Sequence, residues 1–138
     1  MDIEVRRAYV RLRLERAEED LAAAYDDVAN GHARAAANRA YYAVFHSASA
    51  ALVWLDVERV RHSGIQSSFG EILVKPGKIE AEFGAIFGRS RKLREAQDYD
   101  LDAEKLTLDT AAQAVVDAGR FVDRVKQYLA SAGATDDA

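Results

Sequence analysis

The sequence contains no cysteine, which excludes disulfide bonds, thiolate metal sites and a cysteine nucleophile. One proline and eight glycines leave few positions at which a helix must break. No apolar run approaches the roughly eighteen residues of a membrane-spanning helix. The first residues also lack the basic and then apolar layout of a signal peptide. We therefore expect one soluble, cytoplasmic domain that needs no covalent staple.

The charges are nearly balanced, with 19 basic and 23 acidic residues and a net charge of −4. This balance gives no overall attraction to nucleic acid. Basic residues are nevertheless concentrated at Arg89, Arg91, Lys92 and Arg94. Such a cluster fits either a solvated helix face or a local anion-binding surface.

Apolar residues recur at three- and four-residue steps over residues 3–30, 34–57 and 79–97, which is the periodicity of amphipathic helices. In the first segment the expected buried stripe is Val5, Tyr9, Leu12, Leu21, Ala24, Tyr25 and Val28. Asn30 and Gly31 are expected to end this helix, since both tolerate a left-handed backbone.

A short helix should follow Ser63 and end at Pro76-Gly77, and Thr107 should cap the last long helix. No segment shows the sustained two-residue alternation of a strand. We predict an all-α, up-and-down bundle of four long helices plus one short helix over residues 1–132. Residues 133–138 are predicted to form a flexible tail.

The second helix carries a polar group on the side away from its apolar stripe. Arg39, Tyr42 and His46 lie within about 60° of one another by helical geometry. An arginine, a tyrosine and a histidine together can hold a phosphate and exchange a proton. A second packing surface explains the same residues, because arginine and aromatic residues are enriched at contacts. Asn38 lies on the flank of this group.

The fourth helix and the start of the third carry the remaining candidates. Arg94 and Asp98 are spaced for an ion pair, or Arg94 is an anion clamp that Asp98 and Tyr99 assist. Arg91 shares their flank. His62 precedes the third helix, where either an anion or a capping serine would be favourable. The three histidines lack metal-ligand spacing, and glycine-rich phosphate loops are absent, so we expect no metal and no cofactor.

Four segments, in order, resemble the motifs of small stand-alone HEPN proteins over about residues 5–130. They are Asn-Arg-Ala-Tyr-Tyr-Ala-Val-Phe-His at 38–46, Arg-His-Ser-Gly at 61–64, Val-Lys-Pro-Gly-Lys at 74–78 and Leu-Arg-Glu-Ala-Gln-Asp-Tyr-Asp at 93–100. The resemblance implies a helical bundle, commonly dimeric, that binds nucleotides or RNA. Many HEPN relatives are metal-independent ribonucleases of toxin–antitoxin or defence systems, often encoded beside a minimal nucleotidyltransferase.

The sequence departs from the family's ribonuclease motif, which is an arginine followed after four to six residues by a histidine. Arg94 matches the arginine, but Asp98 and Tyr99 stand where the histidine is expected. Arg39 and His46 have the same spacing on a different helix. The resemblance also implies that Tyr99 could accept a nucleotidyl group, as the corresponding tyrosine does in some relatives.

Three hypotheses follow. The first is a HEPN-type toxin or defence component acting on RNA, with Arg94, Asp98, Tyr99 and His46 as catalytic residues and Asn38, Arg39, Tyr42, His62 and Arg91 as binding residues. The second is a non-catalytic, nucleotide-binding partner of a nucleotidyltransferase. The third is a structural homodimer module. We expect a homodimer because Tyr42, Phe45 and Trp54 leave apolar surface to cover.

Overall fold

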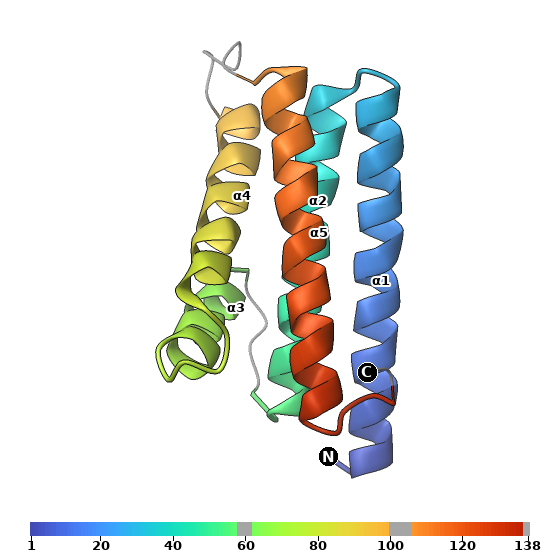
Figure 1. Cartoon of the computed structure of the whole chain (residues 1–138), viewed down its shortest axis with the longest axis vertical. Coiled ribbons are helices and arrows are strands. Elements are labelled where there is room, and N and C mark those ends of the chain that lie inside the picture. The colour runs from blue at the N-terminus through green and yellow to red at the C-terminus, as the bar shows by residue number, and fades with distance from the viewer. Residues whose placement is uncertain (58–61, 100–105, 137–138) are drawn as a thin grey trace.

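The structure is a computed structural model that describes residues 1–57, 62–99 and 106–136; of residues 62, 63, 98 and 99 it describes the backbone alone. Its helices are α1 (Ile3–Ala29), α2 (Ala33–Trp54), α3 (His62–Phe69), the π-helical turn η1 (Gly70–Val74), α4 (Ala81–Tyr99) and α5 (Leu108–Ser131). The four long helices alternate in direction, and α3 with η1 forms the connection from α2 to α4 (Figure 1). The described residues contain no strand. The predicted all-α bundle of four long helices plus one short helix is confirmed.

Local sequence explains where the long helices begin and end. The Asp2 carboxylate accepts a hydrogen bond from the Glu4 backbone N–H at 2.8 Å and caps α1. Gly31, with φ of 77°, turns the chain after α1 as predicted. Thr107 caps α5 by accepting from the Thr110 N–H at 3.1 Å, which confirms that prediction.

The third helix continues beyond Phe69 as a wider turn. In η1 the Lys75 backbone N–H donates to the Gly70 carbonyl at 2.8 Å, five residues earlier. The chain then turns at Gly77, whose φ is 82°. Pro76-Gly77 therefore ends the helical run. Helix α4 starts four residues after Gly77 and packs against α2.

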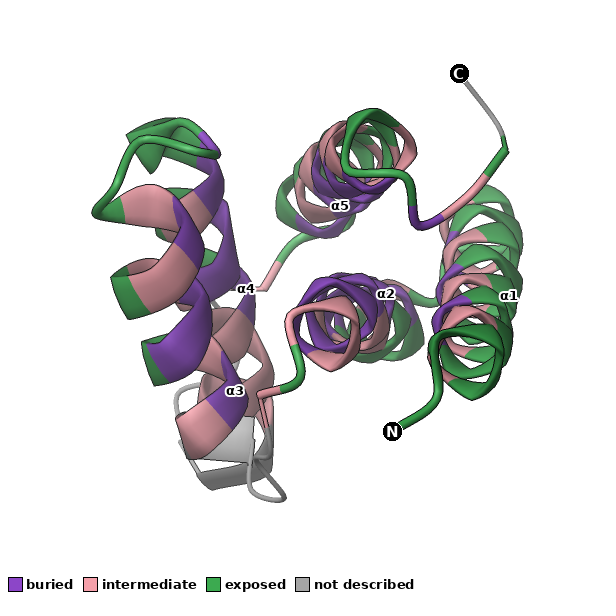
Figure 2. Cartoon of the chain, turned by 90° about the horizontal axis from the view of Figure 1, so that it is seen from below, coloured by how far each residue is buried: buried purple, intermediate pink, exposed green. Residues whose placement is uncertain are grey.

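Helix α2 occupies the centre of the bundle. It contacts α1, α3, α4 and α5, and Figure 2 shows it enclosed between them. Its buried residues are mostly small, namely Ala36, Ala37, Ala40, Ala43, Ala48, Ala50 and Ala51. Small side chains let four neighbours approach one helix closely, because little volume separates the backbones.

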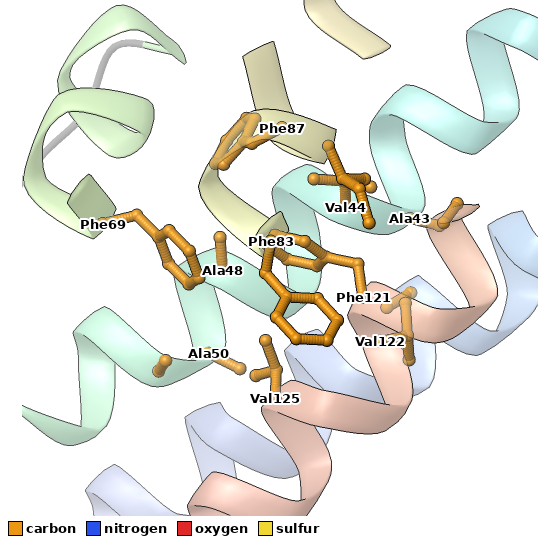
Figure 3. Close-up of a cluster of buried hydrophobic side chains, with 14 of the residues drawn as sticks. Ala43, Val44, Ala48, Ala50, Phe69, Phe83, Phe87, Phe121, Val122 and Val125 are labelled. Carbon is orange, nitrogen blue, oxygen red and sulfur yellow. The ribbon is translucent and has the colours of Figure 1, made fainter. Parts of the chain in front are cut away.

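Four phenylalanine rings join the outer helices to this centre. The Phe121 ring of α5 lies 5.1 Å from that of Phe69, 5.8 Å from Phe87 and 6.4 Å from Phe83, between ring centroids. Figure 3 shows these rings converging beside Val44 and Val125. Their packing positions α3 and α4, and with them the basic residues that follow Phe87.

The predicted stripe of α1 is wrong in part. The fully buried residues are Val10, Ala17 and Ala24, whereas Val5 is 47% and Leu12 48% exposed. Tyr9 and Tyr25 are also about half exposed. The cause is that α1 is an outer helix and buries one side, against α2 and α5. By helical geometry the misassigned residues lie roughly 80–140° from that side.

The two ends of the described chain lie at the same end of the bundle (Figure 1). The Arg7 Nη2 atom donates to the Gly133 carbonyl at 3.2 Å, and Ala134 is buried against the end of α5. Residues 137 and 138 lie outside the described residues, and the domain boundary after residue 132 stays a prediction.

Two valines of α5 test the assignment of its buried side. Val125→Ala should lower the free energy of unfolding by about 2 kcal/mol, because Val125 is fully buried and loses two methyl groups. Val116→Ala is the matched control, since Val116 is 46% exposed and should change stability by less than about 0.5 kcal/mol. The measurement is denaturant unfolding of both variants. Equal losses would contradict the assignment.

Candidate anion-binding site

One strip of α2 stays open between α1 and α4. It consists of Arg34, Asn38, Tyr42 and His46, which follow one another at four-residue intervals. Arg34 and Asn38 are exposed, and Tyr42 and His46 are half-buried. The opposite side of α2 carries its buried alanines, so the polar strip is what the packing of this helix leaves uncovered. We call these four residues the α2 strip.

A small polar pocket lies where the α2 strip meets α4. Its volume is about 140 Å³, and Arg34, Asn38, Arg94 and Gln97 line it. Arg34 donates to the Gln97 carbonyl at 3.3 Å and so links α2 to the last turns of α4. Two arginines and two amide residues around so small a volume suit an oxyanion. We call it the Arg94 pocket.

Aromatic rings of α2 support Arg94 in this pocket. Its Cζ atom lies 4.9 Å from the centroid of the Tyr41 ring and 5.5 Å from that of Tyr42. The faces of aromatic rings attract a guanidinium ion and orient its plane. Burial raises the pKa of the Tyr41 hydroxyl, although Arg94 and Arg91 lower it to a lesser degree. The phenol is therefore neutral at ordinary pH.

A second, larger pocket lies on the other side of the α2 strip, towards α1. Its volume is about 450 Å³, and its lining includes Arg16, Asp20, Arg39, Tyr42 and His46. Asn38 lines both pockets. We call this the Arg39 pocket. It holds together the three residues of α2 that the sequence grouped on one face.

Asp20 of α1 organises the Arg39 pocket. Its Oδ1 atom accepts from Arg39 Nη1 at 3.0 Å, and its Oδ2 atom lies 3.6 Å from His46 Nε2. The Asp20 side chain is 14% exposed and that of His46 16%, so the pair lies mostly out of solvent. A carboxylate beside an imidazole can fix the orientation of the ring.

Residues 10–128 match the family of HEPN domains. The chain belongs to the HEPN family. It is similar to a Methanocaldococcus jannaschii protein named "Putative toxin MJ0605", with 39% identity over 123 residues, 89% of this chain and 90% of that protein. A second protein of that organism, "Putative toxin MJ0142", is 24% identical over 95% of this chain and 88% of its own. A UPF0332 protein of Thermotoga maritima is 36% identical over 51% of this chain and 53% of its own.

The basic cluster of this HEPN protein divides among three neighbours. Arg94 faces the tyrosines of α2, whereas Arg91 donates to Gln66 of α3 at 3.0 Å and to Glu95 at 2.8 Å. Arg89 lies 3.7 Å from Asp117 of α5. The predicted binding residue Arg91 is thus engaged in joining α3 to α4, outside both pockets.

The sequence missed Asp20, which contacts two of the predicted residues. Arg39 and Arg94 line adjacent pockets, which share Asn38, and Tyr42 lies next to both. The side chains of His62, Asp98 and Tyr99 lie outside the described residues, as does all of Arg61. Their proposed roles stay predictions.

Among the described residues, no three histidine, cysteine or acidic side chains are grouped as metal ligands. Nor does that part of the HEPN chain contain a helix long and apolar enough to cross a membrane. The predicted cytoplasmic location stays a prediction.

A double-mutant cycle measures how strongly Asp20 holds Arg39. Asp20→Asn, Arg39→Gln and the double variant should give a coupling free energy of about 0.5 kcal/mol, small because Arg39 is 54% exposed and solvent screens the pair. Denaturant unfolding of the wild type and the three variants supplies the four values. A coupling of zero would mean that the ion pair adds nothing to stability.

Proposed function

We propose that this HEPN protein is a toxin-like component that acts on RNA, with Arg94 as the residue that binds the reacting phosphate. Membership of the family supports this, together with two relatives whose names describe them as putative toxins and which align over most of this chain. RNA cleavage and a partner nucleotidyltransferase are parts of the proposal.

The position of the Arg94 guanidinium, close to the rings of both Tyr41 and Tyr42, is the observation that carries the proposal. Two rings support the guanidinium at the mouth of a pocket that Arg34 also lines. A guanidinium fixed in this way can form two parallel hydrogen bonds to a phosphate. It can stabilise the charge that develops on the phosphate oxygens in the transition state.

Metal-independent cleavage also needs a group that removes the proton of the 2′-hydroxyl and another that protonates the leaving oxygen. We propose that His46 supplies one of these steps. Tyr42, the α2 residue one turn before His46, contacts Arg94, so the helix that carries His46 packs beside the pocket. Asp98 and Tyr99 are the other candidates, because they follow Arg94 in the last turns of α4.

One observation favours the second hypothesis, a nucleotide-binding partner of a minimal nucleotidyltransferase. His46 Nε2 faces Asp20 and its Nδ1 atom is buried. In this arrangement the imidazole lines the Arg39 pocket. Proton transfer at the Arg94 pocket would therefore require the ring to move. A site that binds phosphate without cleaving RNA needs no such movement, and Tyr99 would then be the candidate nucleotidyl acceptor.

We propose that the protein is a homodimer whose interface is formed by residues other than those expected from the sequence. Tyr42, Phe45 and Trp54 are half-buried within the bundle. The larger exposed apolar side chains include Val5, Tyr9 and Leu12, which lie along one side of α1. Apolar surface of this kind is commonly covered by a partner.

Induced expression of the wild type and of Arg94 variants tests the proposed function. Wild-type expression should arrest growth with loss of intact RNA. Arg94→Ala should restore growth and lower RNA cleavage by about 100-fold or more, because the phosphate loses its main charge stabilisation. Arg94→Lys keeps the charge but loses the forked geometry, so cleavage should be intermediate.

Arg89→Ala is the matched control, because Arg89 lies on the same helix and faces α5. It should be as toxic as the wild type, and circular dichroism should show equal helix content for all variants. Full toxicity of a folded Arg94→Ala variant would overturn the ribonuclease proposal. Harmless wild-type expression, with thermal stabilisation by nucleotides, would favour the second hypothesis.

A further inference from the structure

The Arg39 pocket is adjacent to the Arg94 pocket, shares Asn38 with it and has two arginines of its own, Arg16 and Arg39. We infer that it is a second phosphate subsite, so that the α2 strip binds two successive phosphates of one single-stranded RNA. This inference rests on the proposed function, because it takes the Arg94 pocket as the first subsite. It adds to that proposal that the RNA is single-stranded and that it runs along the α2 strip.

The spacing of the α2 strip supports one continuous path. Arg34 lines the Arg94 pocket, His46 lines the Arg39 pocket, and Asn38 lines both. Each four-residue step advances about 6 Å along the helix. Neighbouring phosphates of an extended strand are separated by a similar step, so one strand can contact both pockets without bending the protein.

Tyr42 lies at the junction of the two subsites. Its ring centroid is 5.5 Å from Arg94 Cζ and 6.1 Å from the His46 ring, and its side chain also lines the Arg39 pocket. The nucleoside between two phosphates would pass over this ring. Proteins that bind single strands commonly combine a cationic path with an aromatic side chain in this way.

The charges of the Arg39 pocket explain how the second subsite would be used. The guanidinium groups of Arg16 and Arg39 and the carboxylates of Glu19 and Asp20 line this pocket together. Asp20 already accepts a hydrogen bond from Arg39, so an incoming phosphate must take over that bond. Free inorganic phosphate is therefore expected to bind this pocket weakly. A phosphate that is tethered to one already bound at Arg94 arrives at high effective concentration and can compete with Asp20.

A single strand fits these features better than a duplex. The cationic residues of the two pockets are confined to a narrow path between α1 and α4, and the protein as a whole has a charge of −4. A duplex presents two rigid backbones and calls for a broad basic surface. One flexible strand can follow a narrow path.

The test compares RNAs that differ in their number of phosphates. We would measure binding of 2′-O-methyl RNA, which cannot be cleaved, carrying one, two or three phosphates, at several salt concentrations. For the wild type, affinity should rise roughly tenfold from one phosphate to two, as expected for an added charge-assisted contact. The third phosphate should add much less.

Two substitutions identify the subsites. Arg39→Gln should abolish the gain from the second phosphate, leave binding of the one-phosphate ligand unchanged and reduce the salt slope for the two-phosphate ligand by about 0.7. Arg94→Gln should weaken all three ligands. Arg89→Gln is the control with the same loss of charge, and its affinities should equal those of the wild type.

The outcomes separate this inference from the proposed function. If no ligand binds the wild type, or if Arg94→Gln binds as well as the wild type, the proposed function fails and the inference fails with it. If Arg94→Gln weakens binding while Arg39→Gln behaves like Arg89→Gln, the Arg94 pocket stands and the second subsite is overturned. Equal or tighter binding of duplex RNA would overturn the single-strand assignment.

Discussion

The burial of α2 among four neighbouring helices is the constraint on which the rest of the structure depends. Its alanine-rich surface allows α1, α3, α4 and α5 to approach closely, and the α2 strip remains open between α1 and α4. The same packing brings Tyr41 and Tyr42 beneath Arg94. A cation can be held in a fixed orientation there because the apolar core supplies a rigid aromatic support. Stability of the bundle and the geometry of the anion site thus have one origin.

Much of the fold could be predicted from local signals. Gly31 and Thr107 mark helix ends through backbone conformation and capping, which depend on a few neighbouring residues. The buried side of α1 could not be read in the same way. Two overlapping sets of apolar residues satisfy helical spacing, and the set with the larger side chains, including Tyr9, lies outside the core. Alanines such as Ala17 mark the core side because close packing against α2 needs small residues there.

The candidate site was predictable where its residues share a helix and unpredictable where they do not. Arg39, Tyr42 and His46 are related by the geometry of α2 alone, so their grouping around one pocket followed from spacing. Asp20 comes from another helix, and its acidic neighbours in the sequence resemble ordinary surface. Arg89 and Arg94 are close in sequence, yet 100° per residue directs them to different helices. Which neighbour each one meets depends on tertiary packing that no local pattern contains.

The contact between Arg7 and the Gly133 carbonyl places both ends of the described chain at the base of the bundle in Figure 1. Arg34 and Gln97, which border the Arg94 pocket, belong to the first turn of α2 and the last turns of α4, at the other end. A tag or a fluorophore attached at either end of the described chain would therefore lie at the opposite end of the bundle from the Arg94 pocket.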